Sequence, residues 1–146
     1  MKSVRIIVSS IIIFFSTVSI LQANYAFKKK VKDVCKSYRI NMESSQLSLG
    51  SEEIIINMQS GRNNFEMFML VGFASAGQAI AHQQQMSLSN AYIPGKVRIS
   101  VDVPVSKGEF NTFVAICNSD MAISLSDGRM DSSEFMQEIM KNMEIL

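Results

Sequence analysis

The hydrophobic pattern divides the chain into an apolar N-terminal run and a longer, mixed remainder. Residues 6–23 carry no charge, and the basic residues Lys2 and Arg5 precede them. A short basic start followed by an apolar run is typical of a secretory signal or of a single membrane anchor. The run holds about 18 residues, which is near the lower limit for crossing a bilayer. We assign residues 1–26 to a signal peptide or membrane anchor, and residues 27–146 to a single small domain.

The fate of this apolar segment has three alternatives. Cleavage would follow Ala23 or Ala26, and the serines within the run suit a removable segment. Positive charge directly behind the run opposes translocation, however. The sequence is therefore compatible with an exported and cleaved protein, with an exported and anchored protein, and with an anchor whose C-terminus stays inside. The charges behind the run are Lys28, Lys29, Lys30 and Lys32.

Behind the apolar run, apolar residues at helical spacing predict an amphipathic helix over Phe27–Arg39. Two interpretations are open for its basic side chains. The helix either lies on an anionic membrane surface, or is the first helix of the domain with a solvated basic face. We favour the second. In the first case the membrane contacts would be Lys28, Lys29, Lys30, Lys32 and Lys36.

The next segments predict a loop, a strand and a long helix. Asn41–Ser51 is polar and rich in serine, which favours a loop. Glu53–Met58 contains three successive isoleucines, which favour a strand. Asn63–Gln85 is apolar nearly all round over most of its length, so it predicts a helix that is buried on most sides. Its Gly72 and Ala76 are small enough to allow close packing.

Residues 97–105 alternate strictly between apolar and polar positions. This pattern predicts a half-buried strand with one face towards the core. Residues 111–118 predict a second strand that is buried on both faces, and residues 121–125 predict a third. The outward side chains of the first of these strands are our candidate partner surface: Arg98, Ser100 and Asp102.

The C-terminal segment predicts a helix that begins with Asp131 and Glu134 as a capping box. Its apolar stripe continues through Met136 and Met140 to Leu146. The fold class that follows is α+β. We expect an antiparallel three- to four-stranded meander, covered by the long apolar helix and the C-terminal helix, after an N-terminal signal or anchor segment.

The two cysteines, Cys35 and Cys117, bear on the compartment. In an oxidising compartment a disulfide between them is the expected arrangement. Two separate buried thiols are the alternative. The chain has no C-x-x-C motif, which disfavours a thiol oxidoreductase.

Charge and chemistry narrow the function classes further. Lys28–Arg39 carries six basic residues and one acid, whereas the chain from Ile40 onwards carries twelve acids and six basic residues. Basic residues confined to one short segment do not indicate nucleic-acid binding. His82 is the only histidine, and the methionines are expected in the core. We predict no catalytic, cofactor or metal site.

The function expected from the sequence is that of an exported small envelope protein, periplasmic or secreted, with a binding or structural role. The alternative is a membrane-anchored accessory subunit, held by the N-terminal apolar segment and the basic helix of residues 27–39. A small enzyme is a weaker third hypothesis, because no acid–base constellation is visible. The expected partners are a membrane or an envelope protein.

Overall fold

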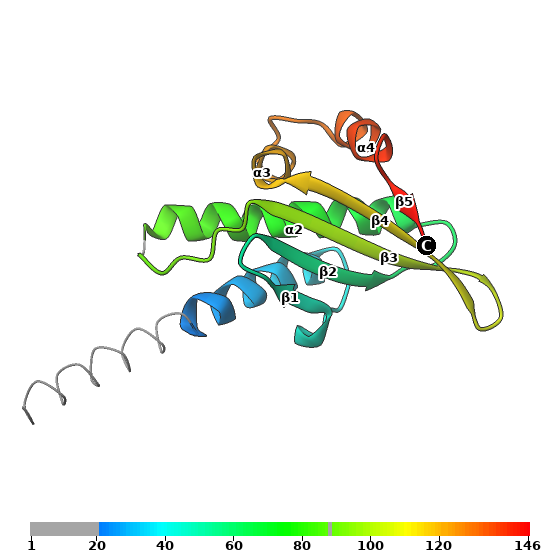
Figure 1. Ribbon diagram of the computed structural model, residues 1–146, viewed down its shortest axis with the longest axis horizontal. Coiled ribbons are helices and arrows are strands. Elements are labelled where there is room, and N and C mark those ends of the chain that lie inside the picture. Colours follow the sequence, from blue (N-terminus) through cyan, green and yellow to red (C-terminus); the bar gives the residue numbers. More distant parts are fainter. Residues whose placement is uncertain (1–20, 88) are drawn as a thin grey trace, which may run out of the picture.

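A five-stranded sheet and the helices on one of its faces make up the part of the chain that the computed structural model describes, residues 21–87 and 89–146 (Figure 1). The strands lie in sequence order: β1 (Leu47–Leu49), β2 (Glu53–Gln59), β3 (Lys96–Ser106), β4 (Glu109–Asn118) and β5 (Glu144–Ile145). The helices are an N-terminal helix described over residues 21–37, η1 (Ser44–Gln46), α2 (Phe65–Met86), α3 (Ser119–Ser126) and α4 (Ser132–Met140). Most of the predicted signal or anchor, residues 1–20, lies outside the described residues.

The predicted α+β class is confirmed, but the sheet is mixed and has five strands. β1 and β2 are antiparallel, as are β3 and β4, and β4 and β5. β2 and β3 run parallel, with Ile54 opposite Val97 and Met58 opposite Val101. A parallel pair requires a crossover connection, and α2 provides it. The strand predicted at Glu53–Met58 is confirmed as β2, but the prediction of an antiparallel meander missed its parallel pairing with β3.

The alternation in β3 is confirmed over most of its length. Val97, Ile99 and Val101 are fully buried beneath the helices, and Val103 is nearly so. The exception is Val105, which is exposed because β2 ends at Gln59, opposite Asp102. Beyond that point only β4 lies beside β3. Pro104 has no backbone N–H to donate, and here β2 offers no acceptor that would need one, as expected for a proline near a strand end.

The predicted strand at residues 121–125 is wrong, since this segment is the helix α3. The side chain of Asn118 accepts a hydrogen bond from the backbone N–H of Met121 at 2.8 Å and so begins the helix. Asparagine is among the preferred residues at this position. The short alternation of apolar residues was overridden by this cap and by the packing of Ala122 against α2.

The C-terminal helix begins as predicted and ends early. Asp131 accepts hydrogen bonds from the backbone N–H groups of Ser133 and Glu134, which confirms it as the N-cap but not the reciprocal Glu134 bond of a capping box. The helix ends at Met140, whose side chain is 54% exposed, so the expected buried stripe does not extend to Leu146. The chain instead returns to the sheet as β5, where Leu146 and Thr112 exchange backbone hydrogen bonds. These bonds satisfy part of the free edge of β4, which a longer helix would leave unpaired.

Two smaller predictions are also corrected. The segment predicted as a loop, Asn41–Ser51, contains η1 and the edge strand β1. β4 is buried on one face over most of its length rather than on both, and its Ile116 is exposed on the other face. The first difference reflects the pairing of β1 with the edge of β2, and the second follows from a sheet that is covered by helices on a single side.

The long helix α2 lies at the centre of the helical layer and confirms the prediction of a helix buried on most sides. Its Gly72 faces the sheet, where an added Cβ would lie 3.1 Å from Ile99. Its Gly77 faces α3, where an added Cβ would lie 2.1 Å from the carbonyl oxygen of Ala122. The small residues of α2 therefore serve close packing within the domain on two of its sides.

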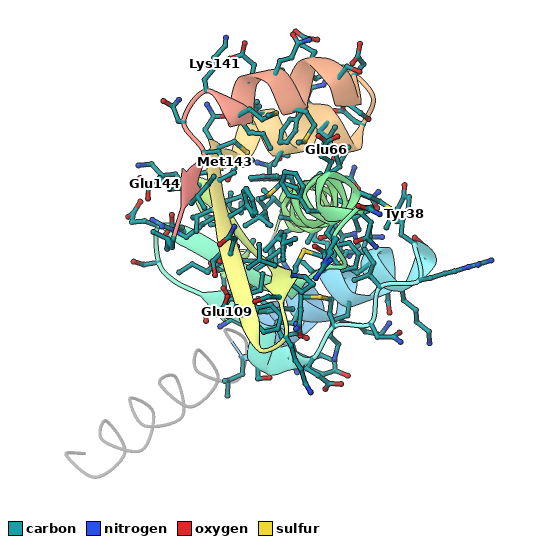
Figure 2. The ribbon with its side chains drawn as sticks, turned by 90° about the vertical axis from the view of Figure 1, so that its right-hand side faces the viewer. Tyr38, Glu66, Glu109, Lys141, Met143 and Glu144 are labelled. Atoms are coloured by element: carbon teal, nitrogen blue, oxygen red, sulfur yellow. The ribbon has the colours of Figure 1, made fainter. Side chains whose placement is uncertain are left out.

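The N-terminal helix packs against the domain, as in the interpretation we favoured. Phe27, Val31 and Cys35 are fully buried, and Ala23 and Val34 are nearly so. Figure 2 shows this blue helix and the yellow-orange α3 on opposite sides of the green α2. Over residues 21–87 and 89–146, no helix is both long and apolar enough to span a bilayer.

Candidate binding surface

The three residues predicted as a partner surface lie together on the face of the sheet that no described helix covers. The alternation of β3 places Arg98, Ser100 and Asp102 opposite the buried valines. All described helices lie on the other side of the sheet (Figure 2). We call this uncovered side the open face. Its other members, given by the strand register, are Lys96 on β3, Glu53, Ile55, Asn57 and Gln59 on β2, Phe110, Thr112, Val114, Ile116 and Asn118 on β4, and Glu144 on β5.

Two charged side chains along the centre of the open face have partners within the sheet. Arg98 Nε lies 3.1 Å from Glu53 Oε1, which joins β3 to β2. Thr112 Oγ1 donates a hydrogen bond of 2.6 Å to Asp102 Oδ1, which joins β3 to β4. Ion pairs that are partly exposed contribute roughly 0–1 kcal/mol to stability. The larger consequence of these bonds is that they fix the side chains along the centre of the face.

Apolar side chains flank this polar row, and the sequence prediction missed them. Phe110 and Ile116 on β4 are exposed, although both are large and apolar. The register pairs Ile116 with Arg98 and Phe110 with Pro104, so they share the open face. The alternation of apolar and polar residues in β4 is weak, because apolar residues occupy both of its faces. Phe110 and Ile116 could have been placed on this face only from the pairing register of β4 with β3.

The predicted disulfide between Cys35 and Cys117 is wrong, since both cysteines are free and buried. Cys35 lies on the N-terminal helix near Ser75 of α2, and Cys117 lies near Ala122 of α3. The helix α2 separates the two sites. Burial raises the pKa of Cys35 and raises the pKa of Cys117 to about 12. Both thiols therefore stay protonated at neutral pH, which disfavours a nucleophilic role.

The five lysines of the predicted membrane contact are spread around the N-terminal helix. Lys28 and Lys32 donate hydrogen bonds to Ser44, at 3.3 and 3.2 Å. Lys29 pairs with Asp33 at 2.6 Å, which raises the pKa of the lysine and lowers that of the aspartate. Lys36 is exposed, and Lys30 lines a hollow beside α2. Lys28, Lys32 and Lys36 follow one another at one-turn spacing on one side of the helix, and Lys30 lies apart from them beside α2.

A shallow groove runs along the side of α2 that faces away from the sheet. Its apolar part, a hollow of about 240 Å³, is lined by Tyr38, Met67, Leu70 and Ala74 among others. A neighbouring hollow of about 200 Å³ contains His82 with Lys30 and Asp127. The two hollows share Gln78 and Ser126.

The described residues contain no cluster of three or more histidine, cysteine, aspartate or glutamate side chains that would hold a metal ion. The acids before α4 have local partners instead. Asp131 caps α4, and Asp127 bonds to Arg129 at 2.7 Å, which together with the backbone N–H of Arg129 lowers the pKa of Asp127. The open face is therefore the candidate site that the structure assembles most fully.

Comparison with known proteins does not indicate a function for this chain. No family model matches the chain, and the comparisons with curated proteins and with solved structures find no match.

Proposed function

We propose that the chain is an exported envelope protein that acts by binding another protein with the open face of its sheet. The observation that carries this proposal is the one-sided covering of the sheet: every described helix lies on the opposite face (Figure 2). Exposed apolar side chains beside ordered polar ones are typical of an interaction surface. Phe110 and Ile116 supply the first kind, and Arg98 with Glu53 supplies the second.

The chemistry of the open face indicates what kind of surface it would bind. Arg98 is paired with Glu53, and Asp102 accepts a hydrogen bond from Thr112 but keeps its charge. Lys96 and Glu144, which the strand register places on the same face, are exposed. The exposed side chains of this face include the apolar Phe110 and Ile116 and the polar Asn57 and Gln59. We therefore expect a protein surface with polar groups opposite the row Arg98, Ser100 and Asp102 and with apolar side chains opposite Phe110 and Ile116.

We further propose that the N-terminal segment is kept as an anchor, following the second of the sequence alternatives. Support comes from the N-terminal helix, which runs unbroken through both candidate cleavage sites, after Ala23 and after Ala26. Ala23 is buried, and its carbonyl oxygen accepts a hydrogen bond of 3.1 Å from Nε2 of the buried Gln83. Cleavage at either site would remove this acceptor, and a buried donor left unpaired costs about 1–3 kcal/mol.

Site-specific photo-crosslinking in cells tests the binding surface. A photoreactive residue replaces Asn57, which is exposed on the open face, or Gln137, which is exposed on α4. We expect an adduct of defined mass from position 57 and none from position 137. The same adduct should be lost when Ile116→Asp is added. It should persist with Val105→Asp, an equally exposed site at the end of the β3–β4 hairpin.

Two results would count against the proposal. The first is an adduct from position 57 that persists in the Ile116→Asp variant while the fold is unchanged by circular dichroism. The second is the absence of adducts from the open face combined with behaviour as an inert monomer in envelope extracts.

A further inference from the structure

Four large apolar side chains are exposed at one end of the domain, where the N-terminal helix begins to be described. Leu21 and Tyr25 of this helix are 68% and 71% exposed. Met86, at the end of α2, is 46% exposed, and Ile93, in the connection to β3, is 48% exposed. We call these four residues the collar. In Figure 1 their segments lie at the left end of the molecule, opposite the β3–β4 turn.

Hydrogen bonds hold the three segments of the collar together. The side chain of Gln83 is buried and spans them: Nε2 donates to the Ala23 carbonyl oxygen and Oε1 accepts from the Tyr92 N–H, both at 3.1 Å. The ring of Phe27 packs edge-on against Tyr92, with 4.9 Å between centroids. Met86 follows Gln83 by one helical turn, and Ile93 follows Tyr92 directly. The collar is therefore a fixed feature of this end of the domain.

A positively charged residue, Lys29, lies on the same face of the N-terminal helix as Leu21 and Tyr25 of the collar. Leu21, Tyr25 and Lys29 are spaced four residues apart, so they lie above one another on one side of the helix. Lys29 is about 12 Å beyond Leu21 along the axis, at 1.5 Å per residue. An apolar residue, then a tyrosine, then a lysine is the order in which side chains cross from the acyl region to the headgroups of a bilayer. The uncharged run of residues 6–23 includes Leu21 and ends two residues before Tyr25.

We infer that the collar lies in the interface of a lipid bilayer and that the N-terminal helix meets the membrane end-on. This inference rests on the proposed anchoring. A helix lying flat on the membrane surface, the first of the two sequence interpretations, would need its apolar face for lipid. That face, with Phe27, Val31 and Cys35, is buried in the domain instead. A bilayer is favoured over a protein partner because the apolar run of the chain enters at this same end.

Depth-dependent quenching of the full chain in lipid vesicles tests this inference. A polarity-sensitive dye is attached to Met86→Cys or Ile93→Cys, with Val105→Cys at the opposite end as the matched control. The native cysteines are buried, which restricts labelling to the new thiol. The vesicles contain phosphatidylcholine and phosphatidylglycerol with spin-labelled acyl chains. We expect quenching by about twofold or more at positions 86 and 93, and almost none at position 105.

The outcomes separate the collar from the anchor. A chain that floats with the vesicles while dyes at positions 86 and 93 stay unquenched would overturn the collar and leave the anchoring intact. A chain that does not float with the vesicles would overturn both. Shielding of the collar in native membranes but not in pure lipid would mean that a protein covers it, which also overturns the inference.

Discussion

Replacing Phe135 with alanine is expected to lower the free energy of unfolding by about 4 kcal/mol. Phe135 is fully buried, and its ring packs edge-on against Phe73 of α2 with 5.0 Å between centroids. Removing the ring deletes this contact and leaves a cavity between α4 and α2. The surrounding helices and sheet are packed too closely to fill it completely. The measurement is urea unfolding of the full chain in a mild detergent.

The matched control is Met140→Ala in the same helix. The sequence pattern placed Met140 on the same apolar stripe as Phe135, but the side chain is more than half exposed. We expect this substitution to change the free energy of unfolding by less than about 0.5 kcal/mol. Equal losses from the two substitutions would contradict the position of α4 described here.

Replacing Gly77 with alanine is expected to cost about 2 kcal/mol, although alanine is the better helix former. The new Cβ would lie 2.1 Å from the carbonyl oxygen of Ala122, and a backbone atom moves only if α3 shifts as a whole. Overpacking of this kind usually lowers the free energy of unfolding by about 1–3 kcal/mol. We expect a loss near the upper end of this range, because the added Cβ meets backbone atoms, which cannot move aside as a flexible side chain can. The gain in helix propensity, about 1 kcal/mol, offsets part of the loss.

Gly72→Ala in the same helix provides the comparison. Its added Cβ would meet Met58 Sδ at 3.0 Å and the side chain of Ile99 at 3.1 Å, and the end of a methionine can move aside. We expect a stability within about 1 kcal/mol of the original chain. If Gly77→Ala is as stable as Gly72→Ala in the same urea titration, the direct contact between α2 and α3 is not present.

The parts of the fold that sequence predicted well are those with long and regular patterns. The alternation of residues 97–105 predicted both β3 and the outward position of Arg98, Ser100 and Asp102. The nearly all-apolar stretch that became α2 predicted a central helix. Periodicity is informative over such lengths because the buried side of each helix or strand must be apolar, so the spacing of apolar residues reveals the type of element.

The parts that sequence missed were decided by contacts between distant segments. Residues 121–125 alternate like a strand, but the cap from Asn118 and the packing of Ala122 on Gly77 make them a helix. The return of the C-terminus as β5 depends on the free edge of β4. The separation of Cys35 from Cys117 depends on α2 lying between them. No local pattern carries this information.

Only the polar residues of the open face could be predicted from the sequence. Arg98, Ser100 and Asp102 follow from the alternation of a single strand, whereas Phe110 and Ile116 join them only through the pairing of β3 with β4. The collar could not be predicted from the sequence for a similar reason. Its four residues come from three segments that Gln83 brings together.

The intact mass of the chain extracted from the membranes of producing cells tests the central claim most directly. That claim is that the N-terminal helix belongs to the folded domain and that the apolar segment before it is retained. We expect a mass of about 16.3 kDa, that of the uncleaved chain. A mature chain that begins at Asn24 or Phe27 would lack the Ala23 acceptor of Gln83 and would contradict the claim.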